Sequence, residues 1–202
     1  MTIRAVVFDI GGVLEITPQT GWVERWEDHL RLKAGELHER LLDVWRDGST
    51  GAIPEAEVER RIGEIMGLER EQVEALMADL WEEYMGTLNV ELAAYFASLR
   101  PRYQTALLSN SFVGARDKEQ ERYQFAEMCD LLIYSHEEGI AKPERRIFEL
   151  TCERLSVQPS EVVFLDDVEA NIAVAREFGF HAILFKETSQ AIAAIQACLQ
   201  AS

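Results

Sequence analysis

Residues 8–14 read FDIGGVL and complete the apolar run IRAVVF of residues 3–8. A short apolar run of this kind is typical of a buried strand, and the Gly-Gly pair that follows marks a turn. A single carboxylate, Asp9, therefore stands where the strand is expected to end. The stretch predicts a fold that begins with a buried strand and presents an acid at the carboxyl end of that strand.

The rest of the chain repeats this pattern. Further apolar runs occur at residues 103–109, 130–135, 162–166 and 181–185. Amphipathic stretches that suit helices lie at residues 89–99, 115–128, 143–155, 168–178 and 189–200. Strand and helix in alternation predict an α/β fold, with a Rossmann-like parallel sheet and helices on both of its faces.

Helix boundaries are marked by a few residues. Asn89 and Ser189 are expected as N-caps, Pro143 in the first turn of a helix, and Gly179 at a helix C-terminus.

Residues 15–88 differ from the rest because helical periodicity runs through them without a strand. Helices are expected at residues 21–34, 36–47, 54–66 and 69–85. All the tryptophans fall in this segment, and we interpret them as packing residues: Trp22, Trp26, Trp45 and Trp81. The predicted organisation is a core of residues 1–14 and 89–202, with residues 15–88 as a helical insert after the first strand.

Composition limits the possible partners. The 202 residues include 36 acidic and 20 basic ones, for a net charge of −16, so no binding surface for nucleic acid or an anionic membrane is expected. Cys129, Cys152 and Cys198 lack metal-ligand spacing and are interpreted as thiols of a reducing compartment. Because no signal peptide or long apolar run is evident, a cytoplasmic location is expected.

Ligands of open parallel sheets bind beyond the carboxyl ends of the strands, which defines a rim of candidate residues. The polar residues expected at this rim are Asp9, Ser109, Asn110, Lys142, Asp166 and Asp167. A carboxylate can act as a nucleophile, and Mg²⁺ is held by carboxylate and phosphate oxygens. A lysine and a hydroxyl can neutralise and orient phosphoryl oxygens. The set fits phosphoryl transfer through an aspartyl-phosphate.

Each of these residues also has an ordinary structural explanation as a helix cap or a turn. The adjacent pair Asp166 and Asp167 is harder to explain in that way. Neighbouring carboxylates at a partly buried rim repel each other unless a cation lies between them.

Four motifs carry a resemblance to a known family: FDIGGVL, LLSNS (107–111), AKPE (141–144) and FLDDVEAN (164–171). Their order, and the helical insert after the first, resemble the haloacid dehalogenase-like (HAD) hydrolases over the whole chain. The resemblance implies a Rossmann-like core with a C1-type helical cap. It also implies that Asp9 is the nucleophile and an Mg²⁺ ligand.

The same resemblance assigns the other motif residues. It implies that Ser109 binds the phosphate and that Lys142 pairs with the phosphate and the nucleophile. Asp167 matches the direct metal ligand and Asp166 the supporting acid behind it, while Asn110 is expected to contact the substrate or phosphate.

Gly11 departs from the family pattern. Phosphatases of this family usually carry a second Asp two residues after the nucleophile, as general acid and base. Gly11 retains the backbone carbonyl that the family uses as a metal ligand, but it cannot deliver a proton. General acid–base catalysis is typically worth about 100-fold to 10,000-fold.

Three interpretations of Gly11 stay open. The protein acts on substrates with good leaving groups, such as sugar 1-phosphates, acyl phosphates or aryl phosphates; or the cap supplies another acid; or activity is weak. The first is favoured, because the motif resembles the FDxGN and FDxGG motifs of a glucose-1-phosphatase-like branch.

The sequence thus predicts an Mg²⁺-dependent phosphatase that hydrolyses a small phosphorylated metabolite. A non-catalytic or weakly active phospholigand-binding module is the alternative. The pair Asp166 and Asp167 counts against a 2-haloacid dehalogenase, which needs no metal, and the order of the motifs counts against a phospho-accepting receiver domain.

His136 follows the third apolar run and is a candidate for the missing proton donor, but a simple loop role is the favoured interpretation. The candidates in the insert for contact with substrate are the basic residues Arg25, His29, His38 and Arg46. Solvent-exposed helix faces carry such residues by default, so none is assigned to the site. The sequence specifies neither the substrate nor the oligomeric state.

Overall fold

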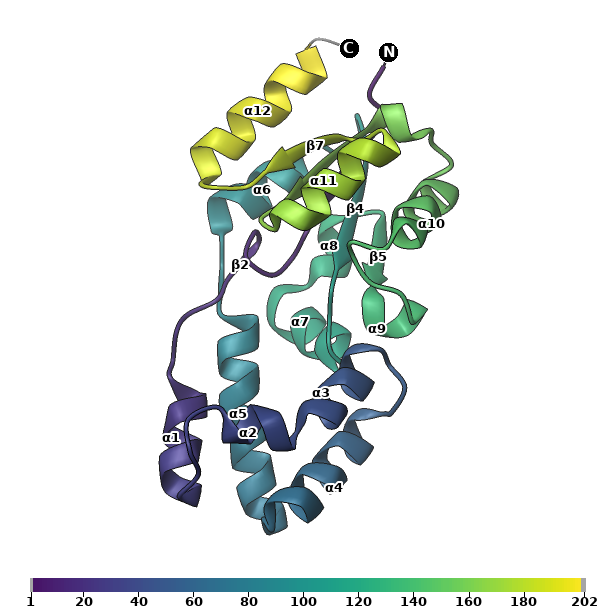
Figure 1. Ribbon diagram of the computed structural model, residues 1–202. Coiled ribbons are helices and arrows are strands. Elements are labelled where there is room, and N and C mark those ends of the chain that lie inside the picture. The colour runs from purple at the N-terminus through teal and green to yellow at the C-terminus, as the bar shows by residue number, and fades with distance from the viewer. Residues whose placement is uncertain (1, 201–202) are drawn as a thin grey trace.

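The computed structural model describes residues 2–200, and its centre is a parallel sheet of five strands. The strands are β1 (Ala5–Phe8), β4 (Gln104–Ser109), β5 (Leu131–Tyr134), β6 (Val162–Asp166) and β7 (His181–Leu184). Their order across the sheet is β5-β4-β1-β6-β7 (Figure 1). This arrangement confirms the predicted Rossmann-like α/β fold, and it places β1 in the middle of the sheet.

Helices cover both faces of the sheet. One layer contains α6 (Val90–Ser98), α8 (Phe125–Met128) and α12 (Thr188–Gln200), and the other contains α10 (Arg145–Leu155) and α11 (Glu169–Phe178). Val6 and Phe8 belong to the apolar cluster of the first layer, whereas Ala5 and Val7 belong to that of the second. Because both faces are buried, β1 is continuously apolar instead of alternating.

The connections between these elements contain shorter helices. They are α7 (Ala115–Tyr123), α9 (Ser135–Glu138) and a 3₁₀ turn at Pro159–Glu161. The single helix predicted over residues 115–128 is therefore two, α7 and α8. They are separated by Gln124, whose φ of 57° lies in the left-handed region and ends the first helix.

Between β1 and α6 the chain leaves the sheet and forms the helical insert at the opposite end of the molecule (Figure 1). Its helices are α1 (Trp22–Leu30), α2 (Glu36–Arg40), α3 (Leu42–Ser49), α4 (Glu55–Met66) and α5 (Arg70–Met85). The single helix predicted over residues 36–47 was wrong, because the chain bends at Leu41. Leu41 is buried with φ −98° and ψ 8°, so its packing interrupts a sequence that has no helix-breaking residue there.

Two very short strands join the insert to the core. β2 (Glu15–Ile16) and β3 (Thr87–Leu88) pair antiparallel, with Glu15 opposite Leu88. The two chain crossings are thereby held side by side. The sequence analysis did not predict this pair, since two residues are too few to show a periodicity.

Two of the predicted helix boundaries are confirmed and two were wrong. Asn89 caps α6, with its side chain accepting a backbone N–H at 3.3 Å, and Gly179 ends α11 with φ 112°. Pro143 lies two residues before α10, after a cis peptide bond, because the loop that carries Lys142 extends through it. Ser189 lies inside α12, where its hydroxyl bonds Glu187.

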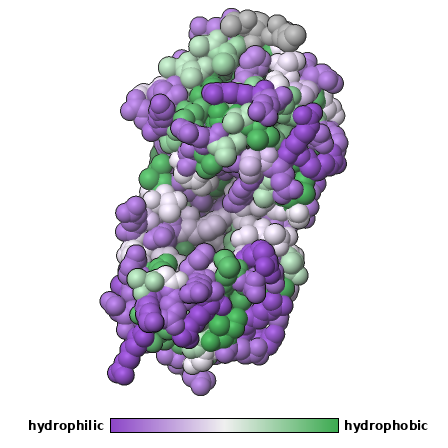
Figure 2. Space-filling model, in the orientation of Figure 1, coloured by the Kyte–Doolittle hydropathy of each residue, from purple (hydrophilic) through white to green (hydrophobic). Residues whose placement is uncertain are grey.

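The surface is consistent with the composition. Figure 2 shows hydrophilic residues over both ends of the molecule, with residues of near-neutral hydropathy gathered at the waist between the sheet and the helical insert. Within residues 2–200, no helix combines the length and the apolar character needed to cross a bilayer. Trp22 and Trp81 are buried, as expected of packing residues.

Candidate active site

Asp9 follows directly after β1, where the strand ends at the rim. Its Oδ1 lies 2.7 Å from Nζ of Lys142 and accepts the backbone N–H of Ile10 at 2.8 Å. The side chain is buried, and this burial raises the pKa of Asp9 to about 7. The Lys142 ammonium opposes that rise and the Asp166 carboxylate adds to it. Asp9 therefore depends on nearby positive charge to stay ionised.

Lys142 lies between two carboxylates. Its Nζ is 2.7 Å from Oδ1 of Asp9 and 2.7 Å from Oδ2 of Asp166, and its side chain is 1% exposed. A buried ammonium is tolerated only when it is paired, and loss of one partner of such a pair costs about 3–5 kcal/mol. The three side chains thus form one buried charged unit at the carboxyl ends of β1 and β6.

Asp166 is itself held on all sides. The Asn171 side-chain amide donates to Asp166 Oδ1 and Oδ2 at 3.0 and 3.1 Å, and the N–H of Val168 donates to Oδ1 at 2.8 Å. With Lys142 on Oδ2, both carboxylate oxygens are engaged. The sequence analysis assigned no role to Asn171, although its place in the first turn of α11, after the acidic pair, was a usable signal.

Asn110 holds the backbone of Lys142. Its Nδ2 donates to the Lys142 carbonyl and its Oδ1 accepts the Lys142 N–H, each at 2.8 Å. Both amide atoms are therefore used to position the lysine, a role that the sequence analysis did not foresee. A contact from Asn110 to substrate or phosphate stays a prediction.

Ser109 is the last residue of β4 and is buried beside the rim. Its hydroxyl donates to the Asn110 carbonyl at 3.4 Å. This distance is beyond the usual range for O–H donors, so the bond is weak and the hydroxyl can turn to a better acceptor.

The acids of the rim fit a divalent cation. One carboxylate oxygen from each of Asp9, Asp166 and Asp167 lies within 4.8 Å of the other two. Asp167 is exposed at one side, but partial desolvation of its carboxyl, together with the charge of Asp166, raises its pKa. Three acidic side chains that share one ammonium leave negative charge uncompensated, and oxygen ligands in this number suit Mg²⁺.

The two glycines of the first motif differ in their constraints. Gly12 has φ +74°, and a Cβ there would lie 2.2 Å from Oδ2 of Asp167, so the motif needs glycine at this position. Gly11 is exposed, its φ lies outside the left-handed region, and a Cβ there would meet nothing described within 4 Å. The backbone conformation and the space at position 11 would therefore accept an aspartate side chain.

His136, on α9, faces Ser111. Its Nδ1 lies 2.7 Å from the Ser111 hydroxyl, and burial lowers its pKa. The ring is thus already engaged in a local hydrogen bond. The proposal that it supplies a proton stays untested.

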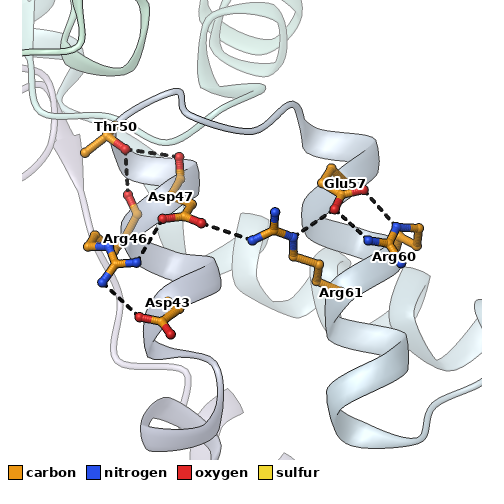
Figure 3. A network of polar contacts seen from close by, with 7 residues as sticks. All are labelled: Asp43, Arg46, Asp47, Thr50, Glu57, Arg60 and Arg61. Carbon is orange, nitrogen blue, oxygen red and sulfur yellow. Dashed lines mark hydrogen bonds and ion pairs between the residues drawn. The ribbon is translucent and has the colours of Figure 1, made fainter.

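The basic residues of the insert have local partners. Figure 3 shows Arg46 paired with Asp43 and Asp47 on α3, and Asp47 bridged in turn to Arg61 of α4 at 3.0 Å. Arg25 lies 3.6 Å from Asp79. The Arg46 network joins α3 to α4 on the surface of the insert.

A second group of buried acids lies near the junction of core and insert. Glu15 and Glu119 are 1% and 0% exposed, and their Oε1 atoms have no hydrogen-bond partner within residues 2–200. The Tyr134 hydroxyl donates to Glu119 Oε2 at 2.5 Å. Burial raises the pKa of Glu119 to about 7 and that of Glu15 to about 9. The negative charge of Glu119 adds to the rise in the pKa of Glu15. No motif in the sequence indicated this pair.

The family follows from a comparison of the whole sequence. The sequence model described as haloacid dehalogenase-like hydrolase matches residues 3–179. The chain belongs to the HAD-like hydrolases. The family and the hydrolase class that the four motifs predicted are thereby confirmed.

Similar proteins include phosphatases. This HAD hydrolase is 28% identical to bifunctional epoxide hydrolase 2 of Sus scrofa over 95% of the chain, but it spans only 38% of the length of that protein. It is 26% identical to the D-ribitol-5-phosphate phosphatase of Bacteroides thetaiotaomicron, covering 88% of this chain and 89% of the relative.

The fold of this chain resembles that of a solved structure. A HAD family enzyme from Bacteroides thetaiotaomicron, in complex with magnesium and inorganic phosphate, superposes with a TM-score of 0.77 at 25% identity. The match covers 91% of this chain and 94% of that one. The core and the helical insert therefore occur together in a known HAD structure.

Proposed function

We propose that this HAD hydrolase is an Mg²⁺-dependent phosphatase that acts on a small phosphorylated metabolite with a good leaving group, through an aspartyl-phosphate on Asp9. The observation that carries the proposal is the buried unit of Asp9, Lys142 and Asp166, with Asp167 beside it. The phosphatase and the magnesium–phosphate complex among the similar proteins support it.

The metal would be held by Asp9, Asp167 and the backbone carbonyl of Gly11, with Asp166 behind them. When bound, Mg²⁺ supplies positive charge that offsets the charge of the phosphoryl oxygens and favours ionised Asp9. Asp166 is a poorer direct ligand, because Lys142, Asn171 and a backbone N–H already engage its oxygens.

The side chains of the rim then act in sequence. An Asp9 oxygen attacks phosphorus, the bond from phosphorus to the leaving oxygen breaks, and that oxygen leaves with the electron pair. Lys142, held against Asp9 by Asp166, neutralises the charge of the phosphoryl oxygens, and Ser109 donates its hydroxyl to one of them. Water then attacks the phosphorus of phosphorylated Asp9, the bond from phosphorus to the Asp9 oxygen breaks with its electron pair on the carboxylate, and the water proton passes to solvent as inorganic phosphate is released.

Gly11 sets the range of substrates in this scheme. No carboxyl at position 11 protonates the leaving oxygen, so the substrate must release an oxygen that is stable as an anion. Substrates with alkoxide leaving groups would react more slowly by about the 100-fold to 10,000-fold that a general acid typically contributes.

We further propose that residues 15–88 act as a cap over the rim, with residues 1–14 and 89–202 as the catalytic core. The insert touches the core where the Val113 N–H donates to the Gly48 carbonyl at 3.2 Å, and where Lys118 pairs with Glu55 at 2.5 Å. Such a cover excludes water while the aspartyl-phosphate forms and opens for release.

Phosphate release from p-nitrophenyl phosphate, glucose 1-phosphate and glucose 6-phosphate, measured with Mg²⁺ and with EDTA, tests the proposal. We expect Mg²⁺-dependent release that favours the first two. Equal activity on glucose 6-phosphate would show that another acid replaces the one missing at Gly11. No release from any of the three would contradict the phosphatase and favour a phospholigand-binding module.

A further inference from the structure

We propose that the leaving group is an aromatic ring, so that the substrate is an aryl phosphate whose ring binds against Trp45, Tyr84 and Phe112. This inference rests on the proposed phosphatase function and names its substrate class.

A cavity of about 490 Å³ lies between the insert and the core. Its core side includes Asn110 and Ala141, the immediate neighbours of Ser109 and Lys142. The cavity therefore adjoins the residues proposed to hold the phosphoryl group. Its volume is within the range of roughly 300–1,000 Å³ that is usual for small-molecule sites.

Aromatic side chains from three segments line this cavity. Trp45 comes from α3, Tyr84 from α5 and Phe112 from the loop after β4. The ring centroids of Trp45 and Phe112 are 5.9 Å apart with planes at 60°, an edge-to-face contact. A Cβ on Gly48 would lie 2.3 Å from the Phe112 ring, so α3 packs directly onto it. The wall is preformed for a flat apolar group.

The polar groups of the cavity are largely engaged already. The Thr50 hydroxyl bonds two carbonyls of α3, the Ser135 hydroxyl accepts the Ser111 N–H at 2.8 Å, and the Ser111 hydroxyl lies 2.7 Å from His136. Both amide atoms of Asn110 are used on the neighbouring loop. A sugar or polyol needs several open hydrogen-bond partners to replace its hydration, and this cavity offers few.

The lack of charge in the cavity lining supports the same substrate class. Among the described residues that line the cavity, none carries a charged side chain. A second anionic group on the substrate would find no cation there, in a chain whose net charge is −16. A neutral ring is the group that this lining accommodates.

An aromatic leaving group also suits an active site that has glycine, and so no proton donor, at position 11. A phenol has a pKa near that of a tyrosine side chain, about 10, whereas water has a pKa of about 15.7, and sugar hydroxyls, the anomeric one included, are weaker acids than a phenol. When the bond from phosphorus to oxygen breaks, phenolate accepts the electron pair without a proton from the enzyme, and solvent protonates it after release. The cavity and the lack of a side chain at Gly11 thus favour the same substrate class.

Kinetics of the wild-type protein with Mg²⁺ test this inference with phenyl phosphate, glucose 1-phosphate and acetyl phosphate. Acetyl phosphate has a good leaving group that is too small to fill the cavity. We expect kcat/KM for phenyl phosphate to exceed that for glucose 1-phosphate at least about tenfold. An equal or higher value for glucose 1-phosphate would overturn the inference and leave the phosphatase standing. No release from acetyl phosphate or the other two would contradict the phosphatase itself.

Variants of Trp45 separate ring binding from general damage. We expect Trp45→Ala to lower kcat/KM for phenyl phosphate about tenfold more than for acetyl phosphate, and Trp45→Phe, which retains a ring, to restore most of the difference. Trp26→Ala is the matched control, because Trp26 lies in the insert outside the cavity, with its Nε1–H on Asp79. A loss in Trp45→Ala that is equal for both substrates would overturn the inference.

Discussion

The rim of the sheet and the aromatic wall between insert and core bury their polar groups in opposite ways. At the rim, Lys142 and Asp166 are buried as ions, each held by at least two partners. At the wall, rings of Trp45 and Phe112 meet edge to face, and the neighbouring hydroxyls are bonded locally. In the proposed mechanism the core supplies the charged groups, whereas the rings that would select the leaving group come from both the insert and the loop after β4.

The largest effect should follow from loss of the nucleophile at the rim. Asp9→Asn is expected to lower phosphate release from p-nitrophenyl phosphate on the order of 1,000-fold or more, because a neutral amide is a poor nucleophile and cannot form the acyl phosphate. Circular dichroism should show an intact fold, since Lys142 keeps Asp166 as its ion-pair partner and Asn retains the size of Asp and an acceptor for the Ile10 N–H. Unchanged turnover would remove Asp9 from the mechanism.

Asn171 tests whether the rim depends on support from α11. Asn171→Ala deletes both side-chain bonds to Asp166, which keeps only the Val168 N–H and Lys142, so Asp166 holds Lys142 against Asp9 less firmly and kcat is expected to fall about 10-fold to 100-fold. Asn89→Ala is the matched control, because the Asn89 side chain caps α6 and bonds the Val13 carbonyl and Thr188 but none of the rim side chains. If Asn171→Ala and Asn89→Ala lower kcat equally for the same loss in the free energy of unfolding, Asn171 has only a structural role.

A carboxyl group can be added to the rim by substitution of Gly11. A Cβ at position 11 meets nothing described within 4 Å, so Gly11→Asp is expected to fold and to raise hydrolysis of glucose 6-phosphate, relative to p-nitrophenyl phosphate, about tenfold or more. Gly11→Asn has the same size without the proton. A gain that Asn reproduces would be a steric effect and would break the link between Gly11 and the leaving group.

The smallest expected effect concerns the buried acids at the junction, which belong neither to the charged rim nor to the neutral wall. Burial raises the pKa of Glu119 from 4.5 to about 7, so the folded protein disfavours the ionised form. Stability is therefore lost as pH rises from about 4.5 through about 7. Glu119→Gln retains an acceptor for Tyr134 and is expected to raise the free energy of unfolding by about 1–3 kcal/mol at pH 8, with little effect at pH 5.

Urea unfolding at pH 5 and pH 8 measures this difference. Glu121→Gln, on the exposed side of the same helix, is the control and should change stability at neither pH. An equal gain for Glu119→Gln at both values would show that a neutral amide simply packs better there, and that ionisation of Glu119 is irrelevant.

Much of the fold could be predicted because its signals are local. Each apolar run became a strand, and the residues after the runs reached a common rim because parallel strands end on the same side. Helix breaks were predicted less well. The bend at Leu41 and the left-handed Gln124 lie in stretches whose residues favour continuous helix, so packing overrode local preference.

The amino-acid sequence by itself thus determined the order of the motifs along the chain, the acids and lysine at the rim, and the glycine at position 11. Only the tertiary structure decided that Asn171 and Asn110 hold Asp166 and Lys142, that Glu15 and Glu119 are buried, and that aromatic rings line one cavity. The reason is physical: a strand end places its next residue by local geometry, whereas a cavity wall or a buried acid depends on segments far apart in the chain meeting in space.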